Sequence, residues 1–179
     1  LITARIIWLF AETGGEPLIA FPPDPPSIIG SAIAIDGDTI EVDGHRLRRW
    51  GIDAPELDQS CTAPSGPYRC GEKAKVYLAG LLKGRTIRCQ PWTDVGDDGT
   101  VVAFCARSMN GTTHPWQLRS LQHDLILEGH AIDYPRYSSG AFAEAQAIAQ
   151  RSGAGLWVGD FQPPWEWRAR RFVREDLAD

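Results

Sequence analysis

The chain has 179 residues, of which 43% are hydrophobic, so it can bury one substantial core but is short for two domains. Its 18 basic and 23 acidic side chains give a net charge of -5, which excludes a global basic field for gathering nucleic acid. The longest apolar run, residues 6–11, is far shorter than the ~18 residues of a membrane span. We therefore expect no membrane span, and we expect a monomer.

Residues 1–29 precede the first regular pattern and are predicted to form an N-terminal arm. The proline-rich run at 21–26 can form neither a helix nor a central strand. A main domain is predicted from residue 30 to residue 160. Its first part is a meander of strands joined by tight turns at Asp-Gly sequences, predicted over 32–35, 39–42 and 45–52.

The second part of the main domain changes between helical and extended patterns. Helices are predicted over 71–82, 118–127 and 141–151, and strands over 86–90 and 101–106. The loop between these two strands is acidic and carries Asp94, Asp97 and Asp98. Strands that come first and helices that come later predict an α+β fold with a small curled sheet.

The C-terminal tail, residues 161–179, mixes tryptophan with arginine. We expect it to pack on the domain, with its Trp side chains covering the domain and its Arg side chains in water. The alternative is a surface for single-stranded nucleic acid, which uses the same combination of aromatic and basic side chains.

The four cysteines have none of the spacings that a structural zinc site favours. Cys89 and Cys105 fall on consecutive predicted strands, and antiparallel neighbours come within disulfide range. Cys61 and Cys70 would close a short loop before the first helix. The alternative is four reduced core thiols. Two disulfides would place the chain in an oxidising compartment, so we expect a secreted or periplasmic protein.

Carboxylates at two turns bracket an arginine. They are Asp36 and Asp38 in the first turn of the meander, and Asp53 and Glu56 after its third strand. Hard cations such as Ca2+ take several oxygen ligands, to which the Ala54 carbonyl could add one. Arg48 has the planar fork of donors that suits a phosphate oxygen beside a metal. The alternative is ordinary turn chemistry, in which Asp and Gly serve only the backbone.

Three ordered motifs resemble the staphylococcal nuclease-like (thermonuclease) family. They are Asp-Gly-Asp-Thr within residues 30–40, Arg-Leu-Arg-Arg-Trp-Gly-Ile-Asp-Ala-Pro-Glu at 46–56 and Gly-Leu-Trp at 155–157. Residues 67–71, 133–138 and 163–168 resemble exported alphaproteobacterial members, some of which carry a label for succinoglycan biosynthesis. The resemblance implies an OB-like five-stranded β-barrel with three α-helices, and Ca2+-dependent hydrolysis of DNA and RNA, with Mg2+ as the alternative cation.

The resemblance also implies roles for individual residues. Asp38 and Asp53 would be metal carboxylates, Ala54 a carbonyl ligand, Asp36 a nearby acid, Glu56 the residue that orients or deprotonates water, and Arg48 the phosphate-binding residue. Tyr137 lies near the place of a substrate-contacting tyrosine, and its alternative role is that of a packing aromatic.

One departure from the family stands out. Where the family places a second catalytic arginine, this chain has Thr100, which cannot supply a positive charge. Two hypotheses follow. The chain is an exported metal-dependent nuclease of weak activity, or it is a catalytically impaired binding protein with the same fold, connected with exopolysaccharide (succinoglycan) biosynthesis.

Overall fold

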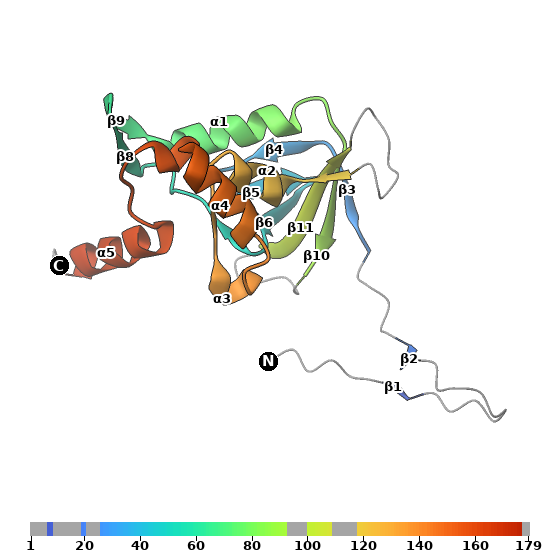
Figure 1. Ribbon diagram of the computed structural model, residues 1–179. Coiled ribbons are helices and arrows are strands. Elements are labelled where there is room, and N and C mark those ends of the chain that lie inside the picture. Colours follow the sequence, from blue (N-terminus) through green and yellow to red (C-terminus); the bar gives the residue numbers. More distant parts are fainter. Residues whose placement is uncertain (1–6, 9–18, 21–25, 93–99, 109–117, 177–179) are drawn as a thin grey trace.

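The computed structural model describes residues 7–8, 19–20, 26–92, 100–108 and 118–176 (Figure 1). The strands are β1 (Ile7–Trp8), β2 (Ile19–Ala20), β3 (Ile28–Gly30), β4 (Ala32–Ala34), β5 (Thr39–Val42), β6 (His45–Arg49), β7 (Ile52–Asp53), β8 (Ser60–Ala63), β9 (Gly66–Arg69), β10 (Ile87–Pro91), β11 (Val101–Ser108), β12 (Leu118–Ser120) and β13 (Ile132–Asp133). The helices are α1 (Cys70–Leu82), α2 (Leu121–Leu127), α3 (Pro135–Ser138), α4 (Ala143–Ser152), the 3-10 helix η2 (Gly155–Val158) and α5 (Pro164–Asp176). The α+β class is confirmed, although most of the predicted arm and acidic loop lies outside the described residues.

The main sheet contains seven strands in the order β3-β10-β11-β6-β5-β4, with β12 paired to β11. Its two edge strands, β3 and β4, are consecutive in the chain and are separated only by Ser31. The sheet must therefore curl enough to bring the end of β3 next to the start of β4, which agrees with the small curled sheet that the sequence predicts. The five expected strands become seven because β3 and β12 join the sheet. β3 lies mostly within the region predicted as an N-terminal arm, so that boundary is wrong: residues 28–30 pair with β10. The pairings among described residues do not close a ring, so the OB-like barrel stays a prediction.

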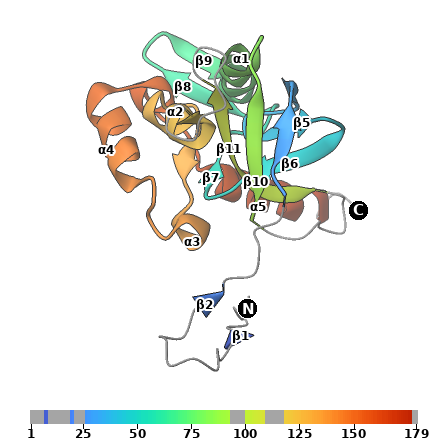
Figure 2. The same ribbon diagram turned by 90° about the vertical axis from the view of Figure 1, so that its right-hand side faces the viewer.

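The hydrophobic core lies between the curled sheet and the helices α1, α2 and α4. Figure 1 shows these three helices grouped together, and Figure 2 shows β10, β11, β6 and β5 side by side next to them. The core consists of side chains contributed by both layers, among them Ile40, Leu47, Leu78, Ile87 and Leu125, all of which are fully buried. Burial of such side chains is the main favourable term in folding.

Both predicted disulfides are confirmed, and no described cysteine is free. Cys89 and Cys105 are directly opposite each other on the antiparallel strands β10 and β11, with Cα atoms 4.1 Å apart. Cys61 and Cys70 join β8 to the start of α1 across 5.7 Å. The short loop that they close is a β8–β9 hairpin, which the sequence did not predict.

Two predicted elements are corrected by tertiary contacts. The helix predicted over 118–127 begins at Leu121, because residues 118–120 pair with the edge of β11 as β12. Ser120 then caps α2, since its hydroxyl accepts a hydrogen bond from the His123 N–H. The strand predicted over 45–52 is broken between β6 and β7 by a turn at Gly51, whose φ of 76° favours glycine.

The C-terminal tail forms a helix, α5, which the sequence did not predict. Pro164 occupies its first turn, where the missing N–H costs nothing. Figure 1 shows α5 outside the group formed by α1, α2 and α4. None of the helices in the described ranges combines the length and apolar character that a membrane crossing requires.

Candidate active site

The first turn of the meander presents Asp38 to the site. The Asp36 carboxylate accepts hydrogen bonds from the backbone N–H groups of Asp38 and Thr39, at 2.9 and 2.6 Å. One oxygen of Asp36 therefore stabilises the turn by binding backbone N–H groups, which was the alternative interpretation of this motif. Its role as a nearby acid in catalysis stays a prediction.

Asp38 ties this turn to the segment that follows β7. Its Oδ1 accepts from the Thr39 hydroxyl at 3.1 Å, and its Oδ2 accepts from the Ala54 N–H at 3.2 Å. The two segments approach closely because residue 37 is glycine. A Cβ there would lie 2.7 Å from the Cβ of Ala54. The two carboxylate motifs therefore meet, as the sequence predicts.

Arg48 faces both acidic motifs. Its Nη2 lies 3.6 Å from Asp38 Oδ2 and 3.4 Å from Asp53 Oδ1. The turn at Gly51 reverses the chain between β6, which carries Arg48, and β7, which ends in Asp53. The Asp53 side chain is 0% exposed, whereas that of Arg48 is 42% exposed. A buried acid therefore holds a guanidinium that remains open to solvent.

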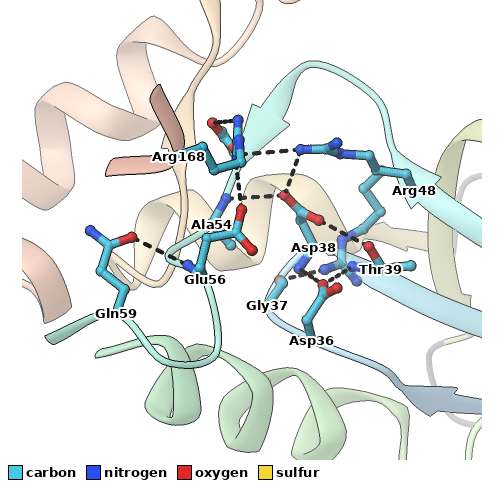
Figure 3. Close-up of polar contacts among 11 residues, drawn as sticks. Asp36, Gly37, Asp38, Thr39, Arg48, Ala54, Glu56, Gln59 and Arg168 are labelled. Atoms are coloured by element: carbon cyan, nitrogen blue, oxygen red, sulfur yellow. Dashed lines mark hydrogen bonds and ion pairs between the residues drawn. The ribbon is translucent and has the colours of Figure 1, made fainter. Parts of the chain in front are cut away.

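A second guanidinium enters the site from α5. Arg168 Nη1 and Nη2 donate to the two oxygens of Asp53 at 3.0 and 2.8 Å, and Nη1 also donates to Glu56 Oε1 at 2.7 Å. Figure 3 shows Arg168 and Arg48 entering the site from opposite sides, with Asp38 and Glu56 between them. The expectation that the arginines of the tail remain in water is wrong for Arg168, whose side chain is 27% exposed.

Sequence reasoning missed Arg168 because its partners lie more than one hundred positions earlier in the chain. One signal was present in the sequence. Trp165 and Arg168 are three residues apart, so a helix starting at the Pro163-Pro164 pair places both side chains on one face.

Besides the contacts of Arg168 with Asp53 and Glu56, several other contacts hold α5 in place. Trp165 stacks on Tyr134 with ring centroids 4.9 Å apart and planes at 9°. The Gln59 side-chain amide donates to the Gln162 carbonyl at 2.7 Å, just before the helix. Arg171 pairs with Asp58 at 3.0 Å, with both side chains more than half exposed. The helix thus packs on the segment that carries Glu56.

Burial and charge together set the protonation of the site. Burial raises the pKa of Asp53 to about 6, although Arg168 and Arg48 oppose the rise. Burial, followed by the charge of Asp38, raises the pKa of Asp36. Burial would lower the pKa of Arg168, but its hydrogen bonds to Asp53 and Glu56 outweigh this effect and raise it. Both site arginines therefore stay charged at neutral pH, since the charge of Asp38 also raises the pKa of Arg48.

A pocket of about 280 Å³ opens over these groups. Its lining includes three acidic residues, three basic residues and Thr100: Asp36, Asp38, Glu56, Arg46, Arg48, Arg168 and Thr100. Thr100 thus faces the site as the resemblance implies. The aspartates of the preceding loop lie outside the described residues.

Tyr137 belongs to a neighbouring cleft of about 670 Å³ rather than to this pocket. The cleft shares Arg48 and Arg168 with the pocket, and its walls include Trp50 and Trp92. The Trp50 and Trp92 rings lie 4.8 Å apart. Tyr137 and Trp92 are each 56% exposed, so both rings are accessible to a ligand.

The carboxylate oxygens of the site are suitable ligands for a divalent cation, but their present contacts leave no place for one on Asp53. Asp38 and Asp53 offer hard oxygen atoms that share the Arg48 guanidinium. However, Arg168 occupies both oxygens of Asp53, and no three His, Cys, Asp or Glu side chains within the described ranges group as a metal site. A cation would have to displace Arg168 from Asp53 and complete its coordination with backbone carbonyl groups or water.

No family model matches the chain. A protein of Rhizobium meliloti (strain 1021) named "Succinoglycan biosynthesis protein ExoI" is 39% identical over 134 residues, covering 73% of this chain and 64% of the relative. A rice protein (Oryza sativa subsp. japonica) named "Probable staphylococcal-like nuclease CAN2" is 27% identical over 149 residues, covering 80% of this chain and 35% of the relative. A protein of Aspergillus flavus named "Probable endonuclease lcl3" is 25% identical over 144 residues and 51% of its length.

The chain thus spans less than two thirds of the length of each of these relatives. An α+β fold with a curled sheet, carrying acidic and guanidinium groups in one pocket, agrees with the two nuclease names. The resemblance to the staphylococcal nuclease-like family is confirmed. The chain is also similar to a rhizobial protein named for succinoglycan biosynthesis.

Proposed function

We propose that the protein is an exported nuclease that hydrolyses phosphodiester bonds of DNA or RNA. The observation that carries this proposal is a pocket lined by Asp38, Glu56 and Arg48, together with the buried Asp53, whose carboxylate contacts Arg48. The names of the plant and fungal relatives support the same class of substrate. The two disulfides support export, since such bonds persist in oxidising compartments.

Glu56 is proposed to orient and deprotonate the attacking water. Its side chain is 35% exposed and lines the pocket, so water can reach it. Water attacks phosphorus, Glu56 accepts the proton, and the bond from phosphorus to the leaving sugar oxygen breaks; that oxygen then takes a proton from solvent water. Arg48 donates to the phosphate oxygens as negative charge develops on them, which stabilises the transition state.

We propose Asp38 and Asp53, with the Ala54 carbonyl, as ligands of Ca2+, with Mg2+ as the alternative. A bound divalent cation would act as a Lewis acid on the phosphate group. The two carboxylates are already drawn together by Arg48. For the cation to bind Asp53, Arg168 must first release the two carboxylate oxygens of Asp53.

The neighbouring cleft is proposed to receive a nucleotide base. Exposed aromatic rings stack on bases of any sequence, and each stack contributes about 1–3 kcal/mol. Tyr137 and Trp92 supply such rings beside Arg48, which belongs to both cavities. The substrate-contacting role of Tyr137 is therefore the one we propose.

The test is cleavage of DNA and RNA by the wild-type protein with Ca2+, with Mg2+ and with EDTA. We expect cleavage that requires a cation, and a rate about 100-fold or more lower for Glu56→Gln, in line with the loss of a general base. Glu72→Gln is the matched control, because Glu72 is an exposed acid on α1 that pairs with Arg69. Absence of cleavage with either cation, or equal rates for wild type and Glu56→Gln, would contradict the proposal.

A second candidate function is that of a binding protein with an impaired site, connected with exopolysaccharide biosynthesis. Two observations favour it: Arg168 holds both Asp53 and Glu56, and Thr100 brings no charge to the pocket. The name of the rhizobial relative agrees with it. Wild-type protein that binds an acidic polysaccharide at low salt and cleaves neither DNA nor RNA would favour this function.

A further inference from the structure

We propose that Arg168 is a second phosphate-binding arginine, delivered by α5 to the same phosphate group that Arg48 binds. This inference rests on the proposed function, and it assigns to the C-terminal helix a direct part in catalysis. It also gives the site a second guanidinium in contact with Asp53, although Thr100 supplies no charge.

The positions of the two guanidinium groups carry the argument. Arg48 Nη2 and Arg168 Nη1 both contact Asp53 Oδ1, at 3.4 and 3.0 Å. Two guanidinium groups that share one oxygen atom are close enough to bind different oxygens of a single phosphate. Both side chains line the pocket that contains Glu56, so a phosphate between them lies beside the proposed base.

The position of the Arg168 guanidinium is fixed by a buried acid. Asp53 is fully buried and accepts two parallel hydrogen bonds from the fork of Arg168. A two-point contact fixes the plane of a guanidinium, which a single ion pair does not. The side chain remains partly exposed on the pocket side, where a phosphate would approach.

The charge of the pocket requires such a residue. A phosphodiester is an anion, and the attack of water adds further negative charge to its oxygens. Asp38, Asp53 and Glu56 would repel that charge. Arg168 neutralises the last two of these acids directly, at 2.7 to 3.0 Å. If a cation displaced Arg168 from Asp53, the contact of Arg168 with Glu56 would still hold its guanidinium in the pocket.

The test compares Arg168→Ala, Arg168→Lys, Thr100→Arg and the double variant Arg168→Ala/Thr100→Arg. We expect Arg168→Ala to lower kcat on single-stranded DNA by about 100- to 1,000-fold, the range for a lost transition-state donor. Arg168→Lys keeps the charge without the fork and should recover only part of the rate. Thr100→Arg adds an arginine to the lining of the same pocket, so we expect the double variant to cleave about tenfold or more faster than Arg168→Ala alone.

Arg171→Ala is the matched control, because Arg171 lies one turn further along α5 and pairs with Asp58 outside the pocket. It should lower kcat far less than Arg168→Ala does, because an exposed ion pair contributes little to holding α5. Equal losses in Arg171→Ala and Arg168→Ala would reduce Arg168 to a packing role and overturn the inference. A rate for Arg168→Ala equal to or above that of the wild type would also overturn it, because Arg168 would then be dispensable or inhibitory.

A binding measurement separates this inference from the proposed function. The probe is a short phosphorothioate oligonucleotide in EDTA, titrated into each variant at low salt. If Arg168 binds phosphate, Arg168→Ala weakens binding by about fivefold or more relative to Arg171→Ala, even if the wild type cleaves nothing. Wild-type protein without cleavage would refute the nuclease proposal alone, whereas equal binding by the two variants would refute the role of Arg168.

Discussion

The site has two walls that are built in different ways. The meander wall, residues 35–56, comes from one continuous stretch of chain, and backbone groups fix its acids: the N–H groups of Asp38 and Thr39 hold Asp36, and the N–H of Ala54 holds Asp38. The helix wall is α5, whose Arg168 meets Asp53 across 115 positions of sequence. Its attachments are side-chain contacts, several of them partly exposed.

The difference indicates which part of the site is preformed. In the meander wall, backbone N–H groups hold Asp36 and Asp38, and Asp53 is buried, so the positions of these three acids can change only if the core changes. Helix α5 is attached by side-chain contacts, namely one aromatic stack, a hydrogen bond from Gln59 and ion pairs, of which the exposed ones contribute little, so it opens at a lower free-energy cost. We therefore expect the meander wall to set the chemistry and α5 to control when the second guanidinium is present.

The largest expected effect concerns the two disulfides. Cys61→Ser/Cys70→Ser and Cys89→Ser/Cys105→Ser should each lower the free energy of unfolding by about 3 kcal/mol, as measured by urea denaturation. Only the Cys61→Ser/Cys70→Ser variant should also lower kcat strongly. Cys70 begins α1, and the next residue, Gly71, lies directly against the backbone of Glu56. A Cβ at Gly71 would lie 1.8 Å from the Glu56 carbonyl oxygen. Equal losses of kcat in the two variants would break the link between this helix start and the meander wall.

The next effect concerns the close approach within the meander wall. Gly37→Ala should cost about 1–3 kcal/mol, because the new Cβ would lie 2.7 Å from that of Ala54 and 2.9 Å from that of Ala74. Gly80→Ala is the control, since its Cβ would meet nothing within 4 Å on an exposed face of α1. Urea denaturation checks both. Equal stability of the two variants would show that the turn does not need glycine.

A smaller effect should distinguish the helix wall. Trp165→Ala removes the stack on Tyr134 and should lower the free energy of unfolding by about 1 kcal/mol. It should also reduce kcat, because α5 would hold Arg168 in the pocket for a smaller fraction of the time. The comparison is Val76→Ala, an exposed side chain on α1 outside the site. A lower stability with an unchanged kcat would show that α5 need not stay docked for catalysis.

The last expected effect concerns the pH dependence of stability and belongs to neither wall of the site. Burial lowers the pKa of His130, stacked on Tyr77, from 6.5 to about 4. Between these values the unfolded chain binds a proton that the folded chain does not, so stability falls as pH drops from 6.5 toward 4. His130→Gln should flatten this part of the pH profile of unfolding without changing the pH dependence of cleavage. An unchanged slope in the variant would assign the effect to other groups.

Local patterns predicted the meander wall well. The Asp-Gly turns, the carboxylates around Arg48 and both cysteine pairs depend on residues close in sequence or on adjacent strands. The failures concern contacts that only the folded chain makes. Residues 118–120 have a helical pattern, yet they form a strand. They pair with the last residues of β11, which lie beyond the stretch that pairs with β6. Arg168 looked like a solvated charge, because nothing in the tail shows that a buried acid 115 positions earlier would bind it.

The most direct test of the two-wall account is a single-turnover cleavage rate on single-stranded DNA with Ca2+, measured side by side for wild type, Glu56→Gln and Arg168→Ala. The account predicts that one change in each wall lowers the rate by about 100-fold or more, with all three proteins folded by circular dichroism. A wild-type rate retained in Arg168→Ala would contradict it, because the meander wall alone would then be the active site.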